Sequence, residues 1–387
     1  MPIINRVADF HSEITGWRRE LHQIPEISFD VPKTAARVAD LLKSFGVDEV
    51  VTGMAKNGVV GVIKGRGPGK TIGLRSDMDA LPINERTGKP YASQTPGKMH
   101  ACGHDGHMAM LLGAAKYLAE TRNFDGTAVV IFQPAEEGDE GGRVMVEEGL
   151  MERFGIEEVY GMHNMPDLAA GSFQIRAGGF MASSDYFTIE IEGAGGHAAK
   201  PHKGVDPVLI AAQTITALQS IASRNVNPLR SAVVSVTMIK AGDAFNVIPQ
   251  KVTLTGTARA LDEAVRGTIE SRISEIARGI AGAMGGTADV YYRRGCPVTT
   301  NTVRETAFAA SIARGVSGGD RVEDNADASM GAEDFSFMLQ ARPGAMIFLG
   351  NGPTAGLHAD TYDFNDEIIP TGVSYWVKLM EGASAAE

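Results

Sequence analysis

Cysteine is scarce in this chain, and long apolar runs are absent. The 387 residues include two cysteines, Cys102 and Cys296, which cannot form a disulfide framework. A chain of this length buries sizeable cores without cross-links, so we expect both thiols to be reduced, with Cys296 a buried structural residue. No run approaches the ~20 apolar residues of a membrane span, and the first residues lack the apolar stretch of a signal peptide. These absences predict a cytoplasmic protein without a membrane partner.

Positive charge is also in deficit. The chain has 36 Lys and Arg residues against 47 Asp and Glu residues, a formal net charge of −11, and no basic cluster stands out. Such a surface repels a phosphate backbone, which argues against nucleic acid as a partner. An anionic substrate would need a local cationic pocket set against this global charge.

The hydrophobic periodicity predicts an α/β fold in the first part of the chain. Apolar residues at three- and four-residue spacing predict helices over 5–22 and 32–45, and a further helix spans about 105–120. Short β-rich runs bounded by glycine or polar turns predict four strands: 59–63, 71–74, 128–132 and 159–162. Strands that alternate with helices favour a largely buried sheet.

The pattern changes after about residue 181. Strands and helices are then predicted in the order β-α-β-β-α-β, over residues 185–192, 206–222, 232–239, 251–259, 261–284 and 288–292. This is the order of a ferredoxin-like sandwich. A short helix (333–339), a strand (345–349) and a final helix (370–380) then return to the first domain. We therefore expect an α/β domain of residues 1–181 and 296–387, with an inserted α+β domain over 182–295.

The segment MHACGHDGH places a thiol and imidazoles within a few residues of each other. Cys102 and His104 are two apart, so in an extended segment both side chains would point to the same side. A thiolate beside an imidazole suits a metal of borderline softness, such as zinc, cobalt, nickel or manganese. The alternative interpretation is a polar helix cap with a buried cysteine.

The segment IFQPAEEG ends an apolar strand in two adjacent carboxylates, Glu136 and Glu137. One of them can face a metal while the other faces the substrate. In a metal hydrolase, the second carboxylate acts as general base on the attacking water. The alternative is a solvated acidic loop, since Asp139 and Glu140 follow at once.

Two more histidines also follow predicted strands, His163 in YGMHN and His358 in GLHAD. Each alone could be an ordinary polar residue. Together with the other candidates they form a joint pattern at strand ends in one α/β domain, where open sheets bind ligands. The candidate ligands are Cys102, His104, Glu137, His163 and His358. Five ligands exceed the need of one tetrahedral ion and suit two ions about 3.5–4 Å apart, bridged by a thiolate or water.

The inserted domain has its own candidate residues. His197 and His202 lie in the glycine-rich segment GAGGHAAKPHKGVD, where glycine permits close approach of the backbone to a ligand. Asn246 in FNVIP and Arg259 in GTARA lie on neighbouring predicted strands. A mobile connector and surface polar residues are the alternatives.

These motifs resemble the M20 metallopeptidases, and within them the branch of hippurate hydrolases, N-acyl-amino-acid amidohydrolases and plant auxin-conjugate hydrolases. The resemblance extends in order from about residue 18 to 375 through these segments: LRSDMDALPI, MHACGHDGHMAMLLGAA, IFQPAEEG, GMHN, GGHAAKPHKGVDP, FNVIP, MGAEDFSFM and GLHAD. It implies a mixed-sheet catalytic domain of the zinc-exopeptidase type. The inserted domain would act as lid and dimerisation domain, giving a homodimer or tetramer.

The resemblance also implies roles. Cys102, His104, Glu137, His163 and His358 resemble the ligands of two divalent ions (zinc, manganese, cobalt or nickel). Glu136 resembles the general base, and His197 the group that steadies the oxyanion. Asn246 and Arg259 resemble groups that hold the substrate, an N-acyl-amino acid.

One departure from the wider superfamily is informative. Many relatives have a metal-binding histidine where this chain has Asp77, and a bridging aspartate where it has Cys102, while Asp79 matches a residue that orients a ligand. The cysteine favours an amidohydrolase over an aminopeptidase. A dipeptidase or carboxypeptidase on the same scaffold, or a metal-dependent binding protein without catalysis, are the rival hypotheses.

Overall fold

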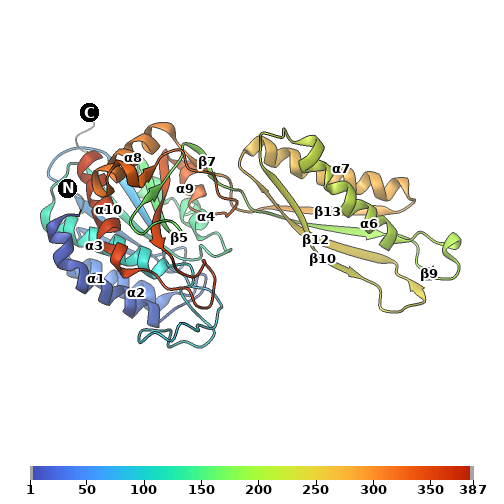
Figure 1. The fold of residues 1–387 in the computed structure, drawn as a ribbon, viewed down its shortest axis with the longest axis horizontal. Helices are drawn as coiled ribbons and strands as arrows, with labels where there is room; N and C mark the ends of the chain where they lie inside the picture. Colours follow the sequence, from blue (N-terminus) through green and yellow to red (C-terminus); the bar gives the residue numbers. More distant parts are fainter. Residues whose placement is uncertain (1–2, 384–387) are drawn as a thin grey trace. The chain divides into compact units, whose positions relative to one another are not determined.

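The computed structural model describes residues 3–383, which divide into two compact units. The first unit comprises the residues up to Phe180, 300–327 and those from Asp334 onward; the second comprises 181–299 and 328–333 (Figure 1). The expected boundaries differ in three places, the first of which is Met181, which begins the second unit. Residues 296–299 belong to the second unit, and so does the short segment 328–333. The hydrophobic pattern of this segment did not predict that the chain returns to the second unit a second time.

The first unit surrounds one large sheet. Its helices are α1 (Asn5–Gln23), α2 (Pro32–Ser44), α3 (His104–Thr121), α4 (Gly141–Glu147), α5 (Leu150–Arg153), α8 (Val303–Ser317), α9 (Ser336–Ala341) and α10 (Ile369–Ala383). Its strands are β1 (Glu49–Met54), β2 (Gly58–Lys64), β3 (Thr71–Asp77), β4 (Thr127–Gln133), β5 (Glu158–Pro166), β6 (Phe173–Gln174), β15 (Val322–Glu323) and β16 (Gly344–Gly352). Strands β7 (Gly178–Met181) and β14 (Thr299–Asn301) span the points where the chain passes between the units.

The eight strands of this sheet are ordered β1-β2-β4-β3-β5-β16-β6-β15. Neighbours from β4 to β16 run parallel, while β1 and β2 form an antiparallel margin. The chain leaves β3 for β4 on one side and then returns to β5 on the other, so the order reverses around β3. A crevice at the carboxyl ends of the strands is expected at such a reversal.

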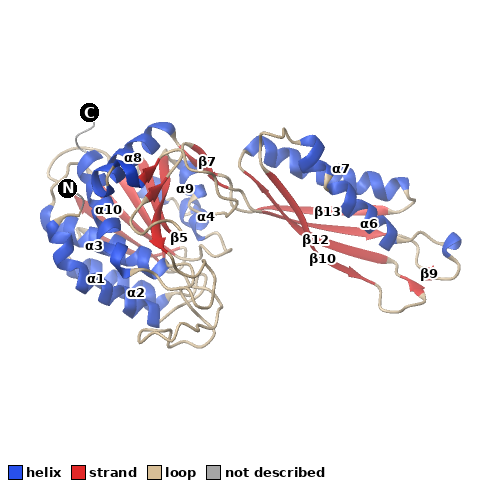
Figure 2. Ribbon diagram, viewed as in Figure 1, coloured by secondary structure: helices blue, strands red, loops and turns tan. Residues whose placement is uncertain are grey.

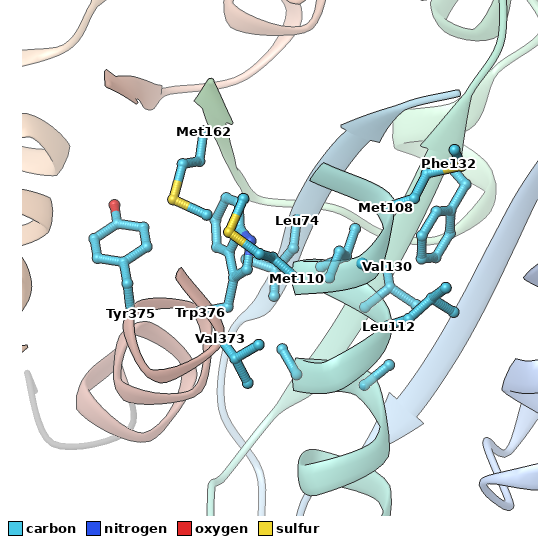
Figure 3. Close-up of a cluster of buried hydrophobic side chains, with 14 of the residues drawn as sticks. Leu74, Met108, Met110, Leu112, Val130, Phe132, Met162, Val373, Tyr375 and Trp376 are labelled. Carbon is cyan, nitrogen blue, oxygen red and sulfur yellow. The ribbon is translucent and has the colours of Figure 1, made fainter. Parts of the chain in front are cut away.

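Helix α3 packs across β2, β3, β4 and β5, and helices α1 and α10 pack against α3. Figure 3 shows Met108, Met110 and Leu112 of α3 between the sheet and Trp376 of α10. Nearly all of α3 is buried, which explains why MAMLLGAA is apolar on every side. Strands β3, β4, β5 and β16 are likewise buried almost throughout, as expected of parallel strands covered on both faces.

The second unit has the predicted β-α-β-β-α-β order. Its elements are β8 (Asp185–Glu192), β9 (Gly196–His197), α6 (Pro207–Leu218), β10 (Ala232–Ala241), β11 (Val247–Ile248), β12 (Lys251–Ala260), α7 (Glu263–Ala283) and β13 (Thr287–Arg294). The main sheet is antiparallel with the order β10-β12-β8-β13, and α6 and α7 cover one of its faces (Figure 2). Both helices begin at an aspartate, Asp206 or Asp262, whose carboxylate accepts backbone N–H groups of the first turn.

The sequence pattern predicted most long elements but missed one helix of 15 residues, Val303–Ser317, and several short strands. Helix α8 and strands β1, β6 and β15 were not anticipated, and the short helix expected over 333–339 begins only at Ser336. The helix expected over 206–222 ends at Leu218 and continues as one wide turn, Ile221–Asn225. Among residues 3–383, no helix has the length and apolar character needed to cross a membrane.

Candidate metal centre

The four parallel strands end at the same edge of the first unit's sheet, and each leads into a candidate residue. Strand β4 ends at Gln133, three residues before Glu136, and β5 contains His163 near its end. Strand β3 ends at Asp77, and β16 ends at Gly352, six residues before His358. The fold thus brings together side chains that are up to 256 residues apart, from Cys102 to His358.

Two groups of donor atoms share Cys102. The first is Cys102, His104 and His163; the second is Cys102, Glu137 and His358; within each, the ligand atoms lie within 4.8 Å of one another. His104, Glu136 and Glu137 form a further group of the same size. A single thiol common to two triads is the arrangement that a sulfur bridging two ions requires. All five residues proposed as ligands are therefore brought together.

The hydrogen bonds of the two buried imidazoles show where their lone pairs point. His104 Nδ1 donates to the carbonyl oxygen of Asp79 at 2.8 Å, and His163 Nδ1 donates to the carbonyl of Asn164 at 2.6 Å. A carbonyl only accepts, so each Nδ1 has a proton, and in the neutral ring the free lone pair is on Nε2. The buried Nε2 of His104 makes no hydrogen bond to the described residues, yet it lies 3.9 Å from Glu137 Oε1 and 4.0 Å from Glu136 Oε2.

A lone pair that faces carboxylate oxygens is repelled unless a cation lies between them. His163 Nε2 similarly faces the sulfur of Cys102 at 3.4 Å. Metal-ligating histidines commonly donate their other ring N–H to a carbonyl, as both do here. The donor set of one thiol, three imidazoles and a carboxylate fits a divalent ion of borderline softness.

Charges around the site keep these donors in the forms that bind metals. Burial lowers the pKa of His163 well below its usual range, so the ring is neutral. Burial opposes ionisation of Glu137, but its hydrogen bond to His358 and the nearby His104 outweigh this and lower its pKa. A neutral imidazole and an ionised carboxylate are what metal coordination needs.

Asp79 organises the turn that presents the two glutamates. Its carboxylate oxygens accept the backbone N–H groups of Glu136 at 2.9 Å and Glu137 at 3.1 Å. The turn also needs Ala135 in the left-handed region, with φ of 58°, a strained conformation often found at functional sites. The expectation that Asp79 orients a ligand thus takes a specific form: its carbonyl orients His104, and its carboxylate orients the glutamates.

Arg75 forms a fully buried network behind this turn. Its guanidinium donates to Gln133 Oε1 at 2.9 Å, Asp77 Oδ2 at 3.0 Å and Asp334 Oδ1 at 2.9 Å. Burial opposes ionisation of Asp77, but His104, His107 and Arg75 together hold its pKa well below the usual range. Arg75 therefore compensates two buried carboxylates, one on β3 and one before α9.

The first turn of α3 is anchored by a second buried charge cluster. His22 Nδ1 lies 2.8 Å from Asp105 Oδ2, and its Nε2 lies 3.2 Å from Glu85 Oε2. Arg18 lies 3.3 Å from the same Asp105 oxygen. An imidazole between two carboxylates is stabilised with a proton on both nitrogens. Burial alone would lower the pKa of His22, but Asp105 and Glu85 outweigh it and raise this pKa to about 9.

This pKa predicts a loss of stability at alkaline pH. The folded-state pKa of His22 is about 9 against an ordinary value of 6.5. The protonated His22 therefore stabilises the fold fully at a pH below its ordinary pKa. This stabilisation is lost as the pH rises through the pKa of the folded state. Urea unfolding at several pH values should give a lower free energy of unfolding for His22→Gln than for wild type near pH 6. The difference in free energy between the two proteins should become smaller by about pH 9.5. A difference that stays constant over this range would contradict the assignment.

Two details of the sequence interpretation are corrected. Cys102 and His104 do not lie on an extended segment: Gly103, with φ of 94°, makes a left-handed turn and His104 is the first residue of α3. His163 lies within β5 rather than after it, because this strand continues to Pro166. His107 was noted only as part of the MHACGHDGH cluster, and Arg18, His22, Arg75 and Asn164 were given no role.

The second unit brings only some of its candidates together. Strands β9 and β11 pair His197 with Val247, and Ala198 N donates to Asn246 O at 3.0 Å, so His197 and Asn246 are neighbours. His197 is exposed, and its Nδ1 accepts from Ala199 N. Asn246 lies in a turn and not on a strand, contrary to expectation. Arg259 lies near the far end of β12, about 26 Å along the strand from Lys251.

A model of peptidase family M20/M25/M40 matches residues 73–382. The chain belongs to this family. The resemblance seen in the motifs is thereby confirmed, and the α/β architecture agrees with it. Hippurate hydrolase of Campylobacter jejuni is 44% identical over 379 residues, which cover 98% of each chain. N-acetyl-L-cysteine deacetylase of Bacillus subtilis is 40% identical over 370 residues, 94% of this chain and 86% of the relative.

A solved M20 structure is similar to the whole chain. The protein is a Bacillus subtilis peptidase described as binding two metals, with 33% identity, a TM-score of 0.87, and coverage of 98% of this chain and 100% of that one. This family member and the shared thiol of the two triads agree in pointing to metal binding at the edge of the sheet.

Proposed function

We propose that this M20 family member is a metal-dependent amidohydrolase. It hydrolyses the amide bond of N-acyl-L-amino acids, such as hippurate-like or N-acetyl substrates, to a carboxylic acid and a free amino acid. The observation that supports this most is the pair of triads sharing Cys102, with Glu136 beside them as a carboxylate outside both. The hippurate hydrolase and the deacetylase among the relatives act on substrates of this class.

The residues that hold the metals in this proposal are Cys102, His104, Glu137, His163 and His358. Two divalent ions, of zinc, manganese, cobalt or nickel, would lower the pKa of a bound water towards ~7. Glu136 accepts a proton from the attacking water while the oxygen of that water bonds to the amide carbon. It then delivers that proton to the nitrogen as the carbon–nitrogen bond breaks, which balances the hydrolysis.

The second unit supplies the remaining roles. His197 donates to the developing oxyanion, and Asn246 and Arg259 bind the substrate's polar groups. The adjacency of His197 and Asn246 on the β9–β11 pair supports a shared role for these two. We further propose that the protein works in the cytoplasm and associates through this unit into a homodimer or tetramer.

A hydrolysis panel tests the function directly. The chelated protein should be inactive, and added Zn²⁺, Mn²⁺, Co²⁺ or Ni²⁺ should restore release of the amino acid from benzoyl- and acetyl-amino acids. The matched substrates are free dipeptides with the same C-terminal residue. We expect a higher kcat/KM for the acylated series, because the hippurate hydrolase and the deacetylase among the relatives are named for acylated substrates.

Two results would overturn the proposal. A clear preference for free dipeptides would favour a dipeptidase or carboxypeptidase on the same scaffold. Binding of acyl-amino acids by the metal-loaded protein without any product, even on long incubation, would favour a binding protein.

A further inference from the structure

A chain of buried polar side chains lies directly behind the ligand triads. It consists of Asp77, His107, Asn164 and Tyr362, all at most 2% exposed. His107 Nδ1 lies 2.7 Å from Asp77 Oδ1, and His107 Nε2 lies 2.9 Å from the backbone N of Asn164. The Asn164 side chain continues the chain to Tyr362. None of these four residues is among the proposed ligands or catalytic groups.

The hydrogen bonds fix the protonation of His107. The backbone N–H of Asn164 can only donate, so His107 Nε2 must accept and has no proton. The proton is then on Nδ1, which donates to the carboxylate of Asp77. Both ring nitrogens are thus committed. Although Asp77, His104 and His107 lie close enough to resemble a third metal site, His107 has no lone pair left for a metal.

Asn164 joins three segments that hold ligands. Its Nδ2 donates to the carbonyl of Cys102 at 2.6 Å, and its Oδ1 accepts from the hydroxyl of Tyr362 at 2.6 Å. It directly follows His163 on β5, and Tyr362 lies four residues after His358. The ligand loops also meet through the backbone, since His358 N donates to Ala101 O at 2.8 Å. One amide thereby fixes the loop of Cys102, the strand of His163 and the loop of His358 against one another.

Gly103 shows how closely this amide fits the turn between two ligands. A Cβ at Gly103 would lie 2.4 Å from Asn164 Nδ2 and 2.6 Å from the Tyr362 hydroxyl, closer than real Cβ atoms approach other atoms. Gly103 also has a φ of 94°, which side chains rarely adopt. The turn from Cys102 to His104 therefore packs directly against the side chains of Asn164 and Tyr362.

We infer that His107 and Asn164 are positioning residues of the metal centre. His107, held by Asp77, orients the Asn164 backbone, and the Asn164 amide sets the distance between Cys102 and the other ligands. This inference rests on the proposed metal site. It assigns to His107 a structural place beside the ligands and excludes it from the ligand set.

The first test compares two buried asparagines. Asn164→Leu removes the amide and keeps the number and branching of the side-chain heavy atoms. The matched control is Asn301→Leu: Asn301 is also buried, and its Nδ2 donates to the carbonyls of Arg176 and Met346, away from the ligands. Co²⁺ titration of the chelated protein should give a thiolate-to-cobalt absorption band from Cys102. We expect Asn164→Leu to bind Co²⁺ about 10–100-fold more weakly with a diminished band, as loss of a supporting residue commonly does.

Asn301→Leu should lose stability in urea but keep the wild-type Co²⁺ affinity and band. If Asn164→Leu bound Co²⁺ as tightly as wild type, the positioning role of Asn164 would be wrong. The proposed metal site would not be affected by that result. If the wild-type protein itself gave no thiolate band, and Cys102→Ser changed nothing, the proposed metal site would fail instead.

The second test needs no folded variant at the site. In metal-free wild-type protein labelled with ¹⁵N-histidine, the His107 signals should show a protonated Nδ1 and an unprotonated Nε2. The resonance is assigned by its absence in His107→Gln, or by its coupling to assigned neighbours if that variant does not fold. A His107 ring protonated at Nε2 would overturn the inference.

Discussion

Glu136→Gln is expected to lower kcat for N-acyl-amino acids by about 10²–10⁴-fold, the usual contribution of a general base. The amide has the shape of the carboxylate but does not accept a proton from water. The backbone of residue 136 stays tied to Asp79 Oδ1, so the turn and the ligand Glu137 should keep their places. Metal content measured by atomic emission should therefore equal that of wild type, as should the urea midpoint.

The matched control is Asp139→Asn, which removes an exposed carboxylate from the same loop, three residues further on. It should retain wild-type kcat and metal content. Wild-type turnover in Glu136→Gln would show that another group accepts the proton. Loss of metal in that variant would mean that Glu136 is a ligand.

Arg75→Leu is expected to lower the free energy of unfolding by about 3–5 kcal/mol, the range for breaking a buried ion pair by removing one partner. Asp77 and Asp334 would be left as buried carboxylates without their cation, and Gln133 would lose its donor. The guanidinium is 1% exposed, so water does not replace it. Urea unfolding of the metal-free protein, followed by circular dichroism, measures the loss.

Arg304→Leu is the control for this prediction. Arg304 also contacts two carboxylates, Glu158 and Glu305, but its side chain is 70% exposed. Exposed ion pairs typically contribute up to about 1 kcal/mol, so the loss should be small. Equal losses in the two variants would mean that burial of the Arg75 network does not matter to stability.

These two predictions concern neighbouring layers of the same site. Glu136 lies beside the candidate ligands His104 and Glu137, while Arg75 is joined to Gln133 at the end of β4. The Asp77 carboxylate belongs to both the Arg75 network and the His107 chain. Loss of Arg75 should therefore weaken metal binding as well as stability, whereas loss of Glu136 should affect only turnover.

The candidate ligands could be proposed from the sequence because a thiol, imidazoles and paired carboxylates occur together in several motifs, although each motif alone has an ordinary alternative. Helices α1 and α10 could also be predicted, since each repeats its apolar residues over several turns. Strands β1, β6 and β15 were missed because two to six residues at a sheet margin give little periodic signal.

The buried polar residues around the candidate ligands could not be predicted from the sequence pattern, for a different reason. Arg75 and Asp334 are 259 residues apart in the sequence, and the hydrogen-bonded pair Asn164 and Tyr362 is 198 residues apart. A buried arginine or asparagine looks the same in sequence as an exposed one. Only the packed fold selects its partners, because a buried polar group must find a hydrogen bond wherever the fold supplies it.

The sequence by itself predicted the candidate ligands, the proposed base beside them and the two-part α/β and α+β organisation. Tertiary structure decided that Cys102 belongs to two triads, that the ring nitrogens of His107 are taken by Asp77 and Asn164, and which atoms hold the turns in place. The reason is that side-chain chemistry is local, whereas the direction of a lone pair depends on hydrogen bonds between strands distant in the chain.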